Sequence, residues 1–220
     1  MLEFVGDSRR LPVYLLIDTS GSMAGPPMLA VNAGLEIFQK VIREDANCRD
    51  SVHACVLCFD SVTRVAAPLT EAATFQAPKL TSQGGTAYSL ALDMLREEIK
   101  RNQKPKSEDY AGDYKPLAFF FTDGAPNPGD PWESALERLN ERKGLRPQFI
   151  AIGAGAGADE TVLRRMAPEH TYMLADLDDP SKVQALFKWI ANSTVAASQQ
   201  AGANPAGGLT LGSAPANLFG

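Results

Sequence analysis

The sequence predicts a doubly wound α/β domain: a mostly parallel six-stranded sheet with one antiparallel edge strand and helices on both faces. Short apolar runs alternate along the 220-residue chain with longer segments whose apolar residues recur at helical spacing. The runs are continuous rather than alternating with polar residues, which is typical of strands that helices cover on both sides. The length fits one such domain with some excess.

Four apolar runs are predicted to be buried strands. They are Val13–Ile17, Val52–Phe59, Leu117–Phe121 and Phe149–Ile152. The pair Asp60-Ser61 separates the second run from residues 62–65 (VTRV), three of which are β-branched. This spacing indicates a tight hairpin, and residues 62–65 are therefore expected to form the antiparallel edge strand.

Helices are predicted wherever apolar residues recur every three or four positions. The two long patterns are Met28, Val31, Leu35, Phe38 and Ile42, and Tyr88, Ala91, Leu95 and Ile99. The two shorter patterns are Trp132, Leu136 and Leu139, and Val183, Leu186, Phe187 and Ile190. Each set would place one face of a helix against the sheet.

The charge balance argues against a nucleic-acid partner. The net charge is −5, from 21 basic and 26 acidic residues, and no basic stripe is visible. No run reaches the roughly 18 apolar residues that a membrane span requires, and residues 1–10 lack the apolar region of a signal peptide. Three cysteines leave an odd one under any pairing, which fits a reducing compartment. We expect a cytoplasmic protein without a membrane partner.

The chain divides into three parts on composition. Residues 1–10 are expected to be an N-terminal extension, residues 11–198 the folded domain, and residues 199–220 a flexible tail. No charged residue follows Lys188, and from Ser198 onward the composition is mainly Ala, Gly, Gln, Asn, Pro and Ser, as in flexible linkers. Its apolar ends, residues 209–211 and 218–219, leave a short docking motif as the alternative.

A cluster of oxygen-bearing side chains is expected at one edge of the sheet. Asp18, Ser20 and Ser22 directly follow the first strand, and Asp123 follows the third apolar run within Thr-Asp-Gly. Thr86 follows a glycine pair before the second long helix. Ligands in open α/β sheets bind beyond the carboxyl ends of the strands. Two carboxylates and three hydroxyls on three such loops form an all-oxygen set suited to a hard divalent cation.

These residues resemble the metal-ion-dependent adhesion site of von Willebrand factor type A (vWA) domains. Asp18, Ser20 and Ser22 match its Asp-x-Ser-x-Ser motif, Thr86 its separate threonine and Asp123 its Thr-Asp-Gly aspartate. The resemblance covers residues 11–198. It implies a Rossmann-like fold, direct or water-mediated coordination of Mg²⁺ or Mn²⁺, with Ca²⁺ also possible, and a protein partner whose acidic side chain completes the metal shell.

A finer resemblance is to the TerY proteins of bacterial tellurite-resistance gene clusters. It lies in residues 10–23 (RLPVYLLIDTSGSM), 80–86 (LTSQGGT) and 112–117 (GDYKPL). It implies a cytoplasmic adaptor in a stress response, with a protein kinase and a PP2C-type protein phosphatase as candidate partners. Residues 1–8 extend beyond the usual start of this pattern.

Enzymatic alternatives have weaker support in the sequence. Residues 21–25 lack the Gly-x-Ser-x-Gly spacing of a nucleophile elbow, and nothing assigns His53 or His170 as a base for a serine. A metal-dependent phosphatase or hydrolase is the stronger enzyme hypothesis, although such sites usually carry more carboxylates or histidines. A metal-sensing switch, in which a closing helix over residues 180–198 moves, is the third hypothesis. Metal-dependent protein binding without catalysis is preferred.

Two further motifs receive structural interpretations. Residues 153–158 match the G-x-G-x-x-A dinucleotide pattern but do not follow the first strand of a βαβ unit and lack an acidic ribose partner, so a flexible loop is expected. Cys55 and Cys58 lie within a strand, where residues three apart point to opposite faces. We therefore expect both to be small buried apolar residues, without a redox or zinc role.

Overall fold

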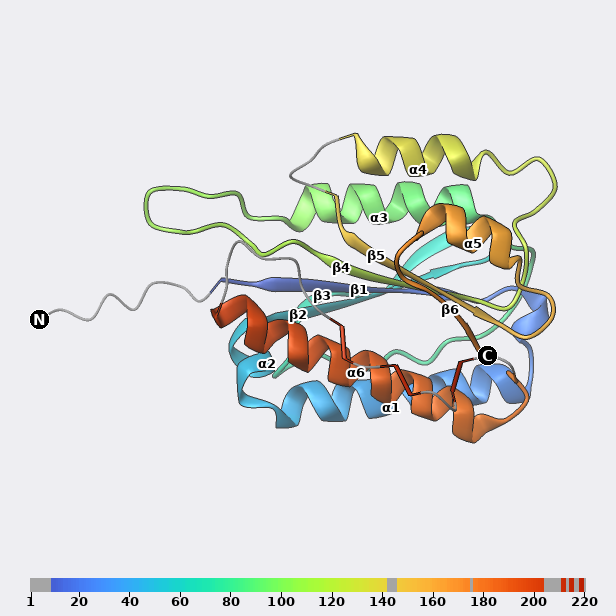
Figure 1. The fold of residues 1–220 in the computed structure, drawn as a ribbon, viewed down its shortest axis with the longest axis horizontal. Helices are drawn as coiled ribbons and strands as arrows, with labels where there is room; N and C mark the ends of the chain where they lie inside the picture. Colours follow the sequence, from blue (N-terminus) through green and yellow to red (C-terminus); the bar gives the residue numbers. More distant parts are fainter. Residues whose placement is uncertain are drawn as a thin grey trace, which may run out of the picture.

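The computed structural model describes residues 9–141, 146–174, 176–203, 211–212, 214–215 and 218–219. Its centre is a six-stranded sheet with the strand order β3-β2-β1-β4-β5-β6 (Figure 1). The strands are β1 (Leu11–Asp18), β2 (Val52–Phe59), β3 (Thr63–Glu71), β4 (Leu117–Thr122), β5 (Gln148–Ala154) and β6 (Thr171–Leu174). All neighbours pair in parallel except β2 and β3, which form an antiparallel hairpin at the sheet edge. The predicted fold class is confirmed.

Helices cover both faces of this sheet. They are η1 (Gly21–Met23), α1 (Pro26–Glu44), α2 (Ala46–Ser51), α3 (Tyr88–Asn102), α4 (Trp132–Asn140), α5 (Glu160–Met166) and α6 (Pro180–Ala203). Figure 1 shows α1, α2 and α6 on one face and α3, α4 and α5 on the other. Apart from the partly exposed Leu136, every residue of the four predicted helical patterns is buried. Among the described residues no helix is both long and apolar enough to cross a membrane.

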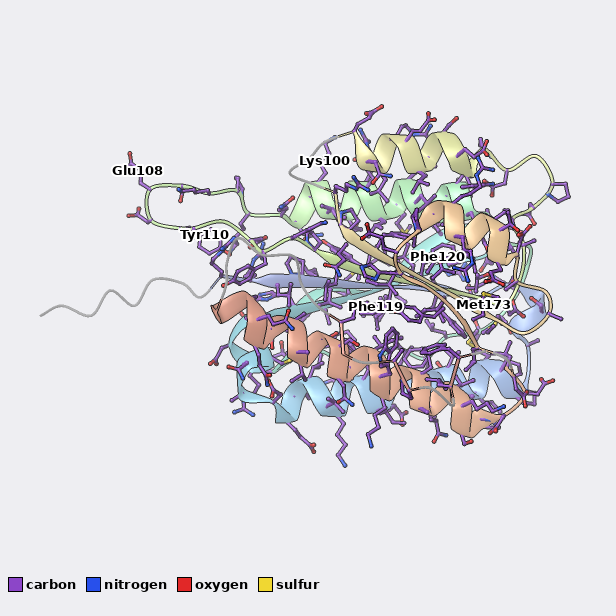
Figure 2. All side chains as sticks on the ribbon, in the orientation of Figure 1. Lys100, Glu108, Tyr110, Phe119, Phe120 and Met173 are labelled. Carbon is purple, nitrogen blue, oxygen red and sulfur yellow. The ribbon has the colours of Figure 1, made fainter. Side chains whose placement is uncertain are left out.

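Side-chain alternation along the strands fills two separate cores. Phe119 packs with the α1 and α6 side, whereas Phe120 packs with the α3 and α4 side (Figure 2). Cys55 and Cys58 are likewise buried in opposite cores, and both are free thiols. This agrees with their prediction as small apolar residues on opposite faces, because successive strand side chains point to opposite sides of a sheet.

A close contact between two helices fixes the position of α1, which begins next to the candidate site. A Cβ atom on Gly34 of α1 would overlap the ring of Phe187 on α6. Only glycine allows the two helices to approach this closely, since any other side chain would have to displace the buried phenyl ring.

The structure also contains elements that the sequence patterns did not locate. These are α2, α5 and β6, the last being the sixth strand. Helix α6 runs to Ala203, five residues beyond the expected end of the closing helix. Within the described part of residues 199–220, the Trp189 indole donates to the Gly212 carbonyl at 3.0 Å, and Leu218 is buried. Phe219 forms an isolated antiparallel bridge with Leu174 at the end of β6.

At the amino-terminal edge of the sheet, a buried ion pair anchors the long α3–β4 connection, whose projecting part carries Glu108 (Figure 2). The Asp113 carboxylate is fully buried and accepts from Arg10 at 2.6 and 2.9 Å, from the Lys104 amide at 2.8 Å and from the Tyr110 hydroxyl at 2.5 Å. Burial raises the pKa of Asp113, but the hydrogen bonds from Arg10 and Tyr110 outweigh it and leave that pKa below its ordinary value.

We expect Asp113→Ala to lower the free energy of unfolding by about 3–5 kcal/mol, because it leaves the Arg10 guanidinium partly buried without its partner. Since the folded-state pKa of Asp113 is depressed, its contribution is complete at neutral pH and is lost as pH falls below about 4. Urea denaturation at pH 7 and pH 3 measures both effects. The exposed Asp109→Ala is the control; an equal loss in both variants would contradict the anchoring role.

Candidate functional site

The carboxyl ends of β1 and β4 bring two of the predicted site loops together. The two strands pair in parallel with Ile17 opposite Phe121, so the residues that follow them, Asp18 and Thr122, lie side by side. The Thr122 hydroxyl donates to Asp18 Oδ2 at 2.5 Å. This hydrogen bond joins the end of one central strand directly to the end of the other.

The loop after β1 continues this contact to the second aspartate. Asp18 Oδ1 accepts from the Ser20 amide at 2.7 Å, which fixes the turn directly after the strand. Ser20 Oγ and Ser22 Oγ are 3.0 Å apart, and the Ser22 hydroxyl donates to Asp123 Oδ1 at 2.8 Å. Four of the five predicted site residues are therefore linked by short polar contacts.

Thr86 reaches the same place through backbone contacts of its own loop. The Gly21 amide donates to the Gly84 carbonyl at 3.0 Å, which holds this loop against the one after β1. The Thr86 amide donates to Asn127 Oδ1 at 3.0 Å. Thr86 Oγ1 lies 3.5 Å from the position that a Cβ on Gly124 would occupy. The structure thus brings all five sequence-predicted residues to one edge of the sheet.

Two glycines allow this close packing of loops. Gly84 has a φ of +72°, a conformation that other residues rarely adopt. A Cβ on Gly157 would lie only 2.5 Å from the Asp123 carbonyl oxygen. The glycine-rich segment 153–158, expected from the sequence only as a flexible loop, therefore packs at this point against the backbone of a site residue.

Supporting residues around the site were missed by sequence reasoning. Asp60, considered only as a turn residue, is almost fully buried and accepts from the Thr19 hydroxyl at 3.1 Å and from Arg64 at 2.6 Å. Its backbone carbonyl accepts from the Ala87 amide at 3.0 Å. Asp60 therefore ties the hairpin to the loops on which Ser20 and Thr86 lie. Its spacing in the sequence is that of an ordinary turn and gave no signal of this role.

The site is electrostatically unbalanced in the absence of a cation. Asp18 is inaccessible to solvent, and burial raises its pKa to about 6, with a further increase from the negative charge of Asp123. Hydrogen bonds from Thr122 and Ser20 oppose this increase. Burial also raises the pKa of Asp123. Among the described residues no lysine, arginine or histidine forms an ion pair with either carboxylate, so a bound cation would relieve the repulsion.

The donor set fits a hard divalent cation. Metal–oxygen distances of about 2.1 Å place adjacent ligand oxygens of an octahedron about 3.0 Å apart, close to the observed 3.0 Å between the serine hydroxyls and 2.8 Å between Ser22 and Asp123. In the part of the chain that the structure describes, no group of three His, Cys, Asp or Glu side chains could hold a metal. The candidate site has only two carboxylates, and its other side-chain donors are hydroxyls.

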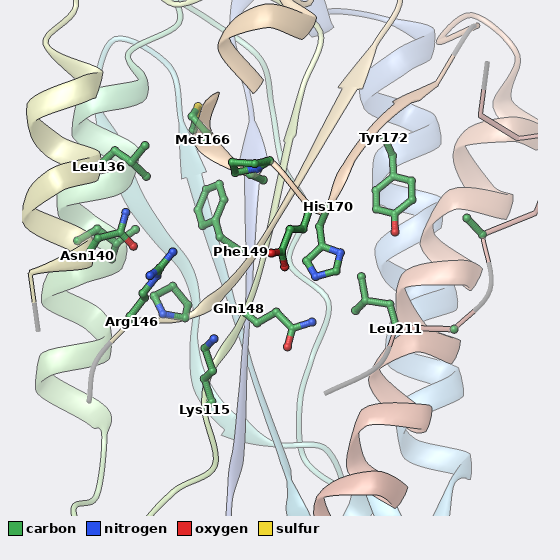
Figure 3. A pocket seen from close by; sticks show the side chains of 17 residues that line it. Lys115, Leu136, Asn140, Arg146, Gln148, Phe149, Met166, His170, Tyr172 and Leu211 are labelled. Atoms are coloured by element: carbon green, nitrogen blue, oxygen red, sulfur yellow. The ribbon is translucent and has the colours of Figure 1, made fainter. Parts of the chain in front are cut away.

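Neither histidine can serve as a base for the site serines. His53 pairs with Pro12 near the start of β1, and His170 directly precedes β6. Both therefore lie at the amino-terminal edge of the sheet, opposite Ser20 and Ser22. His170 lines a cavity of about 710 Å³ at that edge (Figure 3), together with Lys115 and Gln148 at the beginnings of β4 and β5. None of the five predicted site residues lines this cavity.

The described side chains form an oxygen-rich cluster at the carboxyl edge of a doubly wound sheet. The family model for the von Willebrand factor type A domain matches residues 13–189, and the chain belongs to this family. Its architecture is the Rossmann-like vWA fold. No curated protein matches the sequence.

Several solved structures share the fold. A von Willebrand factor type A protein from Catenulispora acidiphila is 18% identical, with a TM-score of 0.67 over 86% of this chain and 43% of that one. Proximal thread matrix protein 1 from the mussel byssus, with a zinc-occupied MIDAS motif, is 20% identical, with a TM-score of 0.62 over 83% of this chain and 48% of that one. This chain spans less than half the length of both proteins.

This chain covers a larger share of a third solved structure. The manganese-loaded TRAP protein of Plasmodium vivax is 22% identical to this chain, with a TM-score of 0.52 over 82% of this chain and 74% of that one. At these identities the similarity establishes the fold alone.

We expect Asp18→Asn to stabilise the metal-free protein at neutral pH by on the order of 1–3 kcal/mol, because the folded-state pKa of Asp18 is raised to about 6. A raised carboxyl pKa means that ionisation opposes folding: the penalty is complete above pH 6 and disappears as pH falls towards 4. Thermal unfolding in EDTA at pH 7.5 and pH 4 tests this expectation, with the exposed Asp50→Asn as control. A less stable Asp18→Asn protein at pH 7.5 would show that the carboxylate is needed structurally.

Proposed function

We propose that Asp18, Ser20, Ser22, Thr86 and Asp123 bind a divalent cation and that this cation binds an acidic side chain of a protein partner. The observation that carries the proposal is the contact series from Asp18 through the two serines to Asp123. Asp18 Oδ1 accepts from the Ser20 amide at 2.7 Å, and the oxygen–oxygen distances from Ser20 through Ser22 to Asp123 are 3.0 and 2.8 Å. Such a set supplies ligands on one side of a cation. The remaining positions face solvent at the exposed Ser22.

The charge of the donor set supports recruitment of an anion. Three of the five side-chain ligands are neutral hydroxyls, and hydrogen bonds from Thr122 and the Ser20 amide already occupy both oxygens of Asp18. The cation therefore keeps much of its charge and can attract an external carboxylate. Hydrolytic metal centres usually carry more carboxylates or histidines than this site, and both histidines lie at the opposite sheet edge.

Mg²⁺ or Mn²⁺ is the proposed native cation, with Ca²⁺ as a looser alternative, because all donors are oxygens and zinc prefers nitrogen and sulfur. Among the similar structures, the Plasmodium protein is manganese-loaded and the mussel protein has a zinc-occupied MIDAS motif. Both ions are thus relevant competitors in a binding experiment.

The cellular role that we propose is that of a cytoplasmic adaptor without catalytic activity. The resemblance of residues 10–23, 80–86 and 112–117 to TerY proteins supports a role in tellurite resistance or a related stress response. Under this hypothesis a protein kinase and a protein phosphatase are the candidate partners, and one of them would present the acidic side chain to the metal.

We expect Mn²⁺ to bind the full chain with one-to-one stoichiometry and Asp123→Ala to abolish that binding. Thr86→Ala should weaken it about tenfold or more, since it removes one neutral ligand. Electron paramagnetic resonance of free Mn²⁺ during titration measures both effects, and displacement by Mg²⁺, Ca²⁺ and Zn²⁺ ranks the metals. Thr70→Ala, on β3 opposite Ala54 and away from the site, is the matched control. Preferential retention of zinc, or unchanged binding by Asp123→Ala, would contradict this assignment.

We expect the natural partner to co-purify with the chain in Mg²⁺ or Mn²⁺, to be lost in EDTA and to return when the metal is restored. Asp18→Ala and Thr86→Ala should abolish capture, whereas Thr70→Ala should leave it unchanged. Phosphate-ester hydrolysis is measured on the same preparations. A partner retained equally in chelator and by Asp18→Ala would contradict metal-mediated recognition. Turnover that requires Asp18 would support a metal-dependent hydrolase instead.

A further inference from the structure

Three exposed apolar side chains lie around the candidate metal site. Among the described residues the exposed large hydrophobic side chains are Leu29 (71% exposed), Val62 (50%), Leu90 (43%) and Val65 (38%). Leu29 lies in the first turn of α1, seven residues after Ser22, and Leu90 lies in the first turn of α3, four residues after Thr86. Both helices begin at the carboxyl edge of the sheet (Figure 1).

Val62 joins this group through the turn between β2 and β3. In that turn the Ser61 hydroxyl accepts from the Gly85 amide at 2.8 Å, and the Asp60 carbonyl accepts from the Ala87 amide at 3.0 Å. These two contacts bind the hairpin turn to the residues directly before and after Thr86. We call Leu29, Val62 and Leu90 the apolar rim.

The surroundings of the apolar rim are uncharged. No charged residue occurs from Thr19 to Leu35 or from Leu80 to Leu92, the segments that hold three of the five candidate ligands. The nearest charged residue of the hairpin, Asp60, is buried and paired with Arg64. A partner that places apolar side chains here desolvates no unpaired charge of these two segments or of the hairpin turn, because the partly exposed Arg64 is paired with Asp60.

The other half of the same edge is acidic. The connections that follow β5 and β6 carry three carboxylates that form no ion pair within the described parts of the chain: Asp159, Asp178 and Asp179. In the sheet order β3-β2-β1-β4-β5-β6, the candidate metal site lies at the boundary between β1 and β4. The hairpin that carries Val62 follows β2 on one side of this boundary, and the acidic connections follow β5 and β6 on its other side.

We infer that this edge is a two-sided docking surface for a protein segment of defined polarity. An acidic residue of the segment binds the metal, apolar residues on one side of it contact the apolar rim, and lysine or arginine residues on its other side face the acidic connections. Charge complementarity selects this occupant, because the acidic half repels nucleic acid and anionic membranes. The inference rests on the proposed metal-dependent function and specifies its partner.

The probe for this inference is a displayed library of random 12-residue peptides, selected on the Mn²⁺-loaded full chain and eluted with EDTA. We expect enriched peptides to carry Asp or Glu with Leu, Ile, Val or Phe on one side and Lys or Arg on the other. A synthetic enriched peptide should bind Leu29→Ser and Leu90→Ser about tenfold more weakly, because each loses a buried apolar contact. Asp178→Lys should weaken binding more at low than at high salt.

The exposed Val65→Ser on β3 is the matched control and should bind the peptide like the unmodified chain. EDTA-eluted peptides without this polarity, or peptides insensitive to Leu29→Ser and Leu90→Ser, would overturn the docking inference while leaving the metal site standing. Failure to enrich any EDTA-eluted peptide would also overturn it. Mn²⁺ titration of the same protein then separates the two failures: intact binding limits the fault to the docking surface, and absent binding refutes the proposed function as well.

Discussion

The parallel pairing of β1 with β4 is the constraint on which the rest of the site depends. These strands are neighbours in space although α1, the β2–β3 hairpin and α3 separate them in sequence. Their register makes Thr122 the hydrogen-bond partner of Asp18, and it places Asp123 within reach of Ser22. Because both strands are buried on both faces, this register cannot slip without moving every core side chain to the wrong face.

Loop-to-loop contacts turn that register into a rigid ligand set. Backbone bonds from Gly21 to Gly84 and from Gln83 to Thr19 hold the Thr86 loop against the loop after β1. Asp60 ties the hairpin to the same two loops, and Gly157 lets the connection after β5 approach the Asp123 carbonyl. The candidate ligands therefore owe their positions to neighbours that bear no metal-binding chemistry themselves, which is the usual requirement for a preorganised site.

The sequence predicted the centre of the fold better than its edges. Continuous apolar runs identified β1, β2, β4 and β5, because strands covered on both faces have no polar positions. Strand β6 has four residues, three of them partly exposed, and α5 has seven, so neither offers enough periodicity to be recognised. The five candidate ligands were predicted because carboxylates and hydroxyls after strands have a chemical signature. The supporting roles of Thr122, Asn127 and Asp60 depend on loop packing, which spacing along the chain does not encode.

The buried carboxylates indicate why such a site is maintained at all. Asp18 is inaccessible to solvent and next to a second acidic group, an arrangement that opposes folding when no cation is present. A fold selected for stability alone would place an apolar or amide side chain at this position. A divalent cation attracts both carboxylates, so its binding stabilises the folded chain. Above Kd this stabilisation grows with the logarithm of the cation concentration. The cluster is therefore better explained by ligand binding than by folding, and its exposed, uncharged side at Ser22 is where a ligand of the cation would enter.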